Sequence, residues 1–238
     1  MRTEATATLK DLALSHPAAA RVFESYHLDY CCGGHQTLGD ACRAAGLNLD
    51  EVVTAVQRAQ REPASEPRWD EASLIALVRF IVDTHHAFTR TELTRIEALL
   101  AKVIARHGAA HSELGKIDRC FVELKADLGP HLLKEEQVLF PYIEALENHR
   151  QQKAPLPPAC FGTIDNPIRM MSIEHDAVGT LLRQIRSLTA DFAPPPDACP
   201  TYQALYQAME GLETDLMRHI HLENNLLFPR ARVLAGLA

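Results

Sequence analysis

The sequence predicts an all-α fold in which a small helical N-terminal domain precedes an up-down four-helix bundle. Apolar residues recur at helical spacing in four long segments after residue 69. Signals for β-structure are missing, since there is no sustained two-residue alternation and no Asn-Gly hairpin turn. We therefore expect two domains, a helical one over residues 1–62 and the bundle over residues 63–238.

Four short helices are expected in the first domain, at residues 8–15, 17–27, 37–45 and 48–61. Thr8 and Asn48 are suited to cap the first and the last of them. Pro17 fits the first turn of the second helix, and the paired glycines at 33–34 favour a turn after it. So small a domain has little core of its own, and we expect it to lean on the bundle or on a partner chain.

The four bundle helices are expected at residues 70–106, 112–148 and 166–191, and from Pro200 to near the C-terminus. The stretch 62–67 is typical of a linker because it is rich in proline and polar residues. Gly129-Pro130 predicts a kink in the second helix. Asn166 is expected to cap the third helix, with Pro167 at its first position.

Composition excludes several classes of protein. A net charge of −7 argues against a nucleic-acid binder, which usually carries a basic excess. No apolar run approaches the length of a membrane helix, and no basic-then-apolar export signal opens the sequence. Six cysteines are too scattered for a secreted disulfide scaffold. We expect a cytoplasmic protein with reduced thiols.

One pattern occurs twice and carries most of the functional information. The residues His131–Pro141 return as His219–Pro229, and both copies read H-x3-E-x4-F-P. A single histidine lies upstream of each copy, His85 before the first and His175 before the second. The intervals are 46 and 44 residues. Two helical hairpins that each offer two histidines and one glutamate predict a pair of metal ions inside the bundle.

Helical geometry supports this hypothesis, because residues four apart lie one turn apart on the same face. Glu135 and Glu223 flank apolar stripes, where an ionised carboxylate is heavily penalised unless it is paired or bound to metal. Each glutamate can bridge two ions about 3.5–4 Å apart. Imidazole with carboxylate suits iron, manganese or zinc, and we choose iron because open positions on such a pair serve O2 or NO chemistry. The predicted ligands are His85, His131, Glu135, His175, His219 and Glu223.

The alternative is that these are ordinary packed or surface residues, since a single H-x3-E is weak evidence. His86 and His221 are adjacent rivals for ligand positions, and α-helical phase favours His85 and His219 over them. Four other histidines are assigned to the surface or to helix caps: His16, His107, His111 and His149. Four cysteines are assigned to packing or loops: Cys42, Cys120, Cys160 and Cys199.

The adjacent pair Cys31-Cys32 precedes two glycines and the expected start of a helix. A helix N-terminus favours a thiolate, and adjacent cysteines join only through a strained and labile disulfide. The pair is therefore either a redox-sensitive or iron-relaying site, or two small residues that fill a turn.

Together these motifs resemble the Repair of Iron Centres family, also called the ScdA-type di-iron repair proteins, over nearly the whole chain. The resemblance rests on Asp29–Gly34, on Glu174-His175-Asp176 and on the two repeated segments at 131–141 and 219–229. It implies a hemerythrin-like bundle that holds two iron ions per chain, bridged by oxide or hydroxide, with the six ligands named above. It also implies a cytoplasmic homodimer.

The resemblance implies repair of iron–sulfur clusters damaged by nitrosative or oxidative stress, by donation of iron to damaged iron–sulfur proteins. Two other functions stay open: an enzyme that reduces nitric oxide at the metal pair, and a sensor or carrier of O2 or NO. No nucleic-acid or membrane partner is expected.

Overall fold

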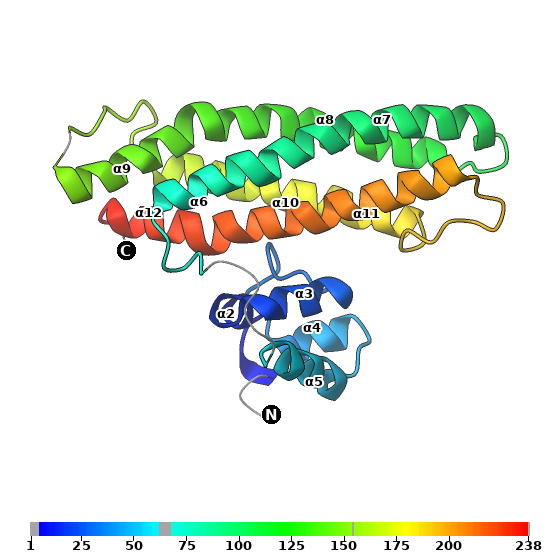
Figure 1. Cartoon of the computed structure of the whole chain (residues 1–238), viewed down its shortest axis with the longest axis horizontal. Helices are drawn as coiled ribbons and strands as arrows, with labels where there is room; N and C mark the ends of the chain where they lie inside the picture. The colour runs from blue at the N-terminus through cyan, green and yellow to red at the C-terminus, as the bar shows by residue number, and fades with distance from the viewer. Residues whose placement is uncertain (1–4, 62–67, 154, 238) are drawn as a thin grey trace.

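The computed structural model describes residues 5–61, 68–153 and 155–237, and these form a helical bundle with a smaller helical domain beside it (Figure 1). The all-α prediction is confirmed: in the described residues there are no strands, only one isolated bridge between Thr8 and Thr37. The expected linker at 62–67 lies outside the described residues. No described helix is long and apolar enough to cross a membrane.

The smaller domain holds four short helices. They are α2 (Leu9–Ser15), α3 (Pro17–Ser25), α4 (Leu38–Ala44) and α5 (Leu49–Ala59). The side chains of Thr8 and Asn48 cap α2 and α5, as the sequence predicts, and Thr37 caps α4. A Cβ on Gly34 would lie 2.4 Å from the Tyr30 carbonyl oxygen, so only glycine fits this turn.

Four long rods form the bundle, three of which carry a π-helical turn (η). In chain order the elements are α6 (Leu74–Phe80), η1 (Ile81–His86), α7 (Ala87–His107), α8 (Leu114–Lys134), η2 (Glu135–Leu139), α9 (Phe140–Gln152), α10 (Asp165–Leu188), α11 (Pro200–His221), η3 (Leu222–Leu227) and α12 (Phe228–Leu234). α7 packs along α11, and α8 packs along α10. α8 runs through Pro130, and the irregular turn of that rod comes after it, at η2.

Asn166 is not the cap of α10, which corrects the sequence-based expectation. The helix starts at Asp165, so Asn166 lies in its first turn. Its side-chain amide donates to the Phe161 carbonyl at 3.0 Å, which ties the preceding loop to the helix.

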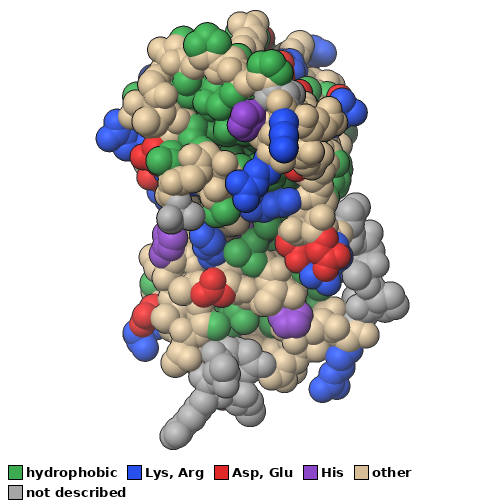
Figure 2. All heavy atoms as spheres, turned by 90° about the vertical axis from the view of Figure 1, so that its left-hand side faces the viewer, with side chains coloured by type: hydrophobic (Ala, Val, Ile, Leu, Met, Phe, Trp, Pro, Cys, Tyr) green, Lys and Arg blue, Asp and Glu red, His purple; other side chains and the backbone are tan. Residues whose placement is uncertain are grey.

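The bundle has two apolar cores. One lies among α7, α8, α10 and α11, with Ile96, Phe121 and Tyr202 fully buried. The other lies among α6, α9 and α12, with Phe140 and Phe228 fully buried. Figure 2 views the molecule from the end formed by α9 and α12, where hydrophobic side chains gather in the upper half. Buried histidines and glutamates lie between the two cores.

The three π-helical turns occur where the polar residues enter the bundle. A π turn bonds residues five apart, so it brings residues at i and i+5 to the same face. Ile81 and His86, Glu135 and Phe140, and Glu223 and Phe228 are such pairs, and every member is buried. In an unbroken α-helix each pair would point about 140° apart. The turns therefore let one rod bury both its polar and its apolar residues.

Candidate metal centre

Two groups of four buried side chains converge between the cores. The first group is His86, Glu135, His219 and Glu223, and the second is His131, Glu135, His175 and Glu223. Within each group the ligand atoms all lie within 4.8 Å of one another. Both glutamates belong to both groups, so the arrangement is two adjacent positions that share two carboxylates.

The distances within the first group fit a coordination sphere. His86 Nε2 lies 3.1 Å from His219 Nε2 and 3.5 Å from Glu135 Oε2. His219 Nε2 lies 2.9 Å from Glu223 Oε1, one helical turn away on the same rod. All four atoms therefore face a single point.

The second group has the same plan. His131 Nε2 lies 3.1 Å from His175 Nε2 and 3.4 Å from Glu135 Oε2. His175 Nε2 lies 3.1 Å from Glu223 Oε2. Glu223 thus turns one oxygen to each group, and the same Oε2 atom of Glu135 approaches a histidine of each. This is the geometry of carboxylates that bridge two ions.

Burial makes these carboxylates unsuitable as ordinary core residues. Glu135 and Glu223 have no solvent exposure, and within the described chain neither oxygen of Glu135 has a hydrogen-bond partner. Burial, and next the charge of Glu223, raise the pKa of Glu135 well above its usual value. Burial alone would also raise the pKa of Glu223. The charge of His219, and hydrogen bonds with His175, His219 and His86, lower this pKa well below its usual value. A cation supplies the compensation that Glu135 lacks.

Two of the four histidines in the cluster favour the neutral form. Burial lowers the pKa of His131 to about 4, and burial also lowers that of His219. Neutral imidazole is the form that binds metal, through the free electron pair of one ring nitrogen. The residues present therefore fit two bound cations with a mixed nitrogen and oxygen donor set.

Polar side chains outside the cluster hold three of the four rings in place. His86 Nδ1 lies 2.7 Å from Glu136, and His131 Nδ1 lies 2.8 Å from Glu174. His175 Nδ1 lies 3.0 Å from the Asn224 side-chain oxygen. Such bonds fix the tautomer that leaves Nε2 free for metal. The sequence analysis missed these three residues, although each is the neighbour in sequence of a predicted ligand.

His85 is not among the converging side chains, and His86 lies at the position in the cluster that the sequence-based set gave to His85. His85 Nδ1 lies 2.9 Å from Asp215, and its ring stacks on His219 with 5.8 Å between centroids. The sequence-based choice of His85 assumed regular α-helical phase, in which the residue four positions after Ile81 lies on the inner face. The π turn η1 instead places His86, five positions after Ile81, on that face. The other five predicted ligands are in the cluster.

His221, the other rival, also lies outside the cluster. Its Nδ1 atom accepts a hydrogen bond of 2.9 Å from the Asn225 amide. The Tyr30 ring of the small domain packs against it, with 5.1 Å between ring centroids. It therefore belongs to the contact between the two domains.

Cys31 and Cys32 lie against the bundle next to a cluster histidine. Their sulfur atoms are 3.8 Å apart as free thiols, and Cys32 Sγ lies 3.6 Å from the His175 carbonyl oxygen. The hydrogen bond with Cys32 and burial raise the pKa of Cys31 well above its usual value. Contrary to the sequence-based expectation, the pair does not lie at a helix N-terminus, because α4 begins only at Leu38.

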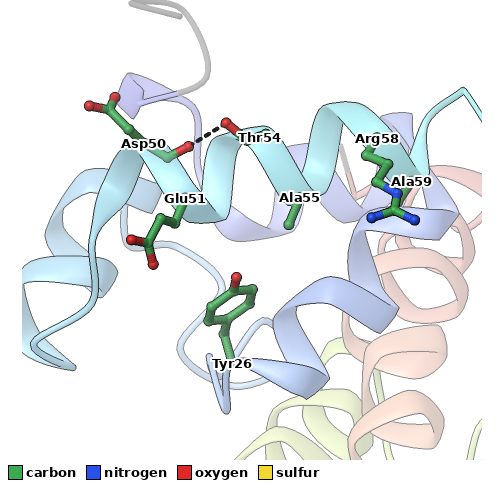
Figure 3. Close-up of a pocket in the computed structure, with 7 residues that line it drawn as sticks. All are labelled: Tyr26, Asp50, Glu51, Thr54, Ala55, Arg58 and Ala59. Atoms are coloured by element: carbon green, nitrogen blue, oxygen red, sulfur yellow. Dashed lines mark hydrogen bonds between the residues drawn. The ribbon is translucent and has the colours of Figure 1, made fainter.

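Several pockets are lined by residues of the small domain. An open one between Tyr26 and α5 carries Asp50 and Glu51 at one end and Arg58 at the other, and their charged groups do not converge (Figure 3). Another, of about 280 Å³, lies between the small domain and the bundle, and His85 and Asp215 line it. Since His85 stacks on His219, this second pocket adjoins the cluster.

Comparison with known proteins gives consistent matches. Residues 77–231 match the hemerythrin HHE cation-binding domain, and residues 5–60 match ScdA_N, described as a domain of unknown function. The chain is 36% identical over 224 residues to the "Iron-sulfur cluster repair protein YtfE" of Yersinia pseudotuberculosis serotype IB (strain PB1/+). It has the same identity to the proteins of that name from Yersinia pestis strains Pestoides F and Angola. Each alignment covers 94% of this chain and 96% of the relative.

Proposed function

The chain belongs to the hemerythrin HHE family and to the family of the iron–sulfur cluster repair protein YtfE, and on that premise we propose that it repairs iron–sulfur clusters by donating iron. The observation that carries the proposal is the double cluster that shares Glu135 and Glu223. We propose two iron ions as its occupants, held by the histidines at 86, 131, 175 and 219 and by both glutamates.

A low negative charge at the cluster supports release of the iron. The two shared glutamates carry two negative charges against four positive charges of two divalent ions. Glu136 and Glu174 stand just outside, but Arg90 bonds to the first at 2.8 Å and Lys134 bonds to the second. These cations offset the outer carboxylates, so the site stays short of negative charge and holds iron less firmly than a carboxylate-rich one.

The surroundings of the cluster offer a way for iron to leave. The pocket of about 280 Å³ adjoins His85 and Asp215, and a carboxylate there is an oxygen donor for a departing ion. Cys32, beside the backbone of His175, is a second candidate acceptor. We propose these two places as relays to the damaged iron–sulfur protein.

Further parts of the proposal concern the setting of the protein. All six cysteines are free thiols, which supports a reducing compartment such as the cytoplasm. The homodimer and the roles of NO and O2 as ligands rest on the family resemblance. Light scattering tests the first, and spectra of the iron-loaded protein with each gas test the second.

A repair assay tests the main proposal. The iron-loaded protein is mixed with a dehydratase whose cluster has been damaged by nitric oxide, and the recovered activity is measured. We expect recovery with the wild type and with Glu210→Gln, a matched control on the exposed face of α11. Glu223→Gln, which loses a shared ligand, should bind less iron and restore correspondingly less activity.

Two results would count against the proposal. Equal recovery with Glu223→Gln that holds no iron would show that the iron of the cluster is not the donor. Many turnovers of nitrous oxide formation by the wild type, without recovery of the dehydratase, would favour the nitric oxide reductase instead.

A further inference from the structure

A second group of metal-binding side chains lies at the opposite end of the bundle. His107 is the last residue of α7, and His111 follows it in the connection to α8. Asp197 and Cys199 lie in the connection from α10 to α11. Both connections are at the end of the bundle away from α9 and α12 (Figure 1). From His86 to His107 the rod is about 30 Å long, so this group is separate from the double cluster.

Three of the four side chains converge at distances suited to one ion, and Cys199 contacts one of them. The ligand atoms of His107, His111 and Asp197 all lie within 4.8 Å of one another. His111 Nε2 lies 3.0 Å from the nearer oxygen of Asp197, and His107 Nε2 lies 3.3 Å from Cys199 Sγ. Ligands around a tetrahedral zinc ion lie about 3.3–3.8 Å apart. The ligand atoms of His107, His111 and Asp197 are thus close to the spacing of a coordination sphere, and Cys199 would complete it if its side chain turned from His107 toward the other two.

Neighbouring residues hold the two imidazoles as they hold those of the double cluster. His111 Nδ1 lies 2.9 Å from Glu113, which leaves Nε2 to face Asp197, and this repeats the arrangement of His131 with Glu174. The Tyr202 ring packs against both rings, with centroids 5.4 Å from His107 and 5.6 Å from His111. The two rings are therefore fixed before any ion arrives.

Cys199 adds a donor that an ordinary ion pair does not use. It is the N-cap residue of α11, a helix of 22 residues, and its sulfur atom lies 3.3 Å from His107 Nε2. An ion pair between His111 and Asp197 alone would involve neither His107 nor Cys199. Two imidazoles, a thiolate and a carboxylate are the donors that zinc-class ions take in tetrahedral sites.

We propose that His107, His111, Asp197 and Cys199 form a second metal site that takes one divalent ion of the zinc class. On binding, the thiol and any protonated imidazole release their protons to solvent, and nothing is oxidised or reduced. The bound ion ties the α7–α8 connection to the α10–α11 connection. From the sequence, both histidines were assigned to the surface or to helix caps, and Cys199 to packing or loops.

Titration of the iron-loaded protein with Co²⁺ tests the site, with iron content followed throughout. We expect one cobalt ion to bind without loss of iron, with a thiolate-to-cobalt charge-transfer band. Cys199→Ser should abolish the band, while the control Cys160→Ser, at an exposed cysteine, should keep it. Glu113→Gln, which changes the group bonded to His111 Nδ1, should weaken Zn²⁺ binding about 10- to 100-fold in calorimetry. Circular dichroism verifies that every variant is folded.

Three outcomes would overturn the proposal. The first is cobalt uptake only in exchange for iron. The second is a band that survives Cys199→Ser but disappears with Cys32→Ser, which places the ion at the N-terminal cysteine pair, where Asp29 is also in reach. The third is equal Zn²⁺ affinity in the wild type and in His111→Ala. None of these outcomes changes the result of the repair assay, which depends on the iron bound at the double cluster.

Discussion

At the residue scale, two adjacent histidines have different tasks, although both are buried. His86 turns Nε2 toward Glu135 and His219, while His85 turns Nδ1 toward Asp215. Burial does not distinguish them, since His85 is 5% exposed and His86 is 0% exposed. The direction of the ring nitrogens decides which of the two residues faces the cluster.

Replacing each histidine in turn separates these tasks. We expect His86→Ala to lose at least one of the proposed irons, because three donors remain on its side of the cluster and a cavity opens beside them. His85→Ala should keep the full iron content, since its ring touches the cluster only by stacking on His219. Metal analysis of anaerobically purified variants measures both. Loss of iron in His85→Ala with full retention in His86→Ala would restore the sequence-based ligand set.

The sequence held no signal that favours His86. Upstream, the stripe Leu77, Val78 and Ile81 points to the residue at 85. Downstream, the buried apolar residues of α7 are at least as close in α-helical phase to 85 as to 86. A π turn inserts one residue into the helical repeat, and regular α-helical spacing does not reveal it. The other five residues of the cluster were predictable because H-x3-E needs only one regular turn, and His175 lies inside unbroken α10.

At the scale of elements, the π turns reconcile two requirements on one rod. A polar residue needs to face the cluster, and an apolar residue five positions before it in η1, or five positions after it in η2 and η3, needs to face the core. Pro141 and Pro229 follow two of the turns and cannot donate a backbone bond, which favours an irregular turn just before them. The repeat H-x3-E-x4-F-P thus encodes the turn as well as the ligands.

Deleting one residue tests whether η1 is an insertion in an otherwise regular helix. Removing Asp83, which is exposed, makes Ile81 and His86 four positions apart, so an α-helix would still bury both. We expect this variant to fold, with a free energy of unfolding within about 2 kcal/mol of the wild type. Removing the exposed Ala98 in α7 turns the residues on one side by about 100°. That control should lose more than about 4 kcal/mol or fail to fold.

Denaturant unfolding followed by circular dichroism compares the two deletions. If both are equally damaging, the π turn is required by its own contacts rather than by helical phase. If the Asp83 deletion folds yet binds iron weakly, then the turn serves the ligand geometry more than the stability of the rod.

At the scale of the whole molecule, the small domain is held on the bundle by a few polar contacts. Arg218 pairs with both oxygens of Glu24 at 2.8 and 2.7 Å, and Tyr30 donates to the same carboxylate at 2.8 Å. Asn225 donates to the Tyr30 carbonyl oxygen at 3.3 Å. The sequence predicted that this domain would need support, because its core is small. It could not place the contact, since the partners lie almost 200 residues apart in the chain.

His221 makes this contact sensitive to acid. Burial, and next the charge of Lys10, lower its pKa to about 4. Asn225 donates to its Nδ1 atom, which requires the neutral ring. In the unfolded chain the pKa returns to about 6.5. Above that pH the ring is neutral in both states, and its titration does not change stability.

The free energy of unfolding should therefore fall as the pH drops from about 6.5 to 4, because in this pH range only the unfolded state takes up a proton at His221. A difference of about 2.5 pKa units corresponds to about 3 kcal/mol, reached near pH 4. His221→Gln keeps an acceptor for Asn225 but does not titrate, so the wild type should lose about 3 kcal/mol more than this variant over the window. Denaturant unfolding at matched iron content measures the difference. Because His131 and His219 are common to both proteins, their titration cancels, and parallel pH profiles would show that His221 is not the group responsible.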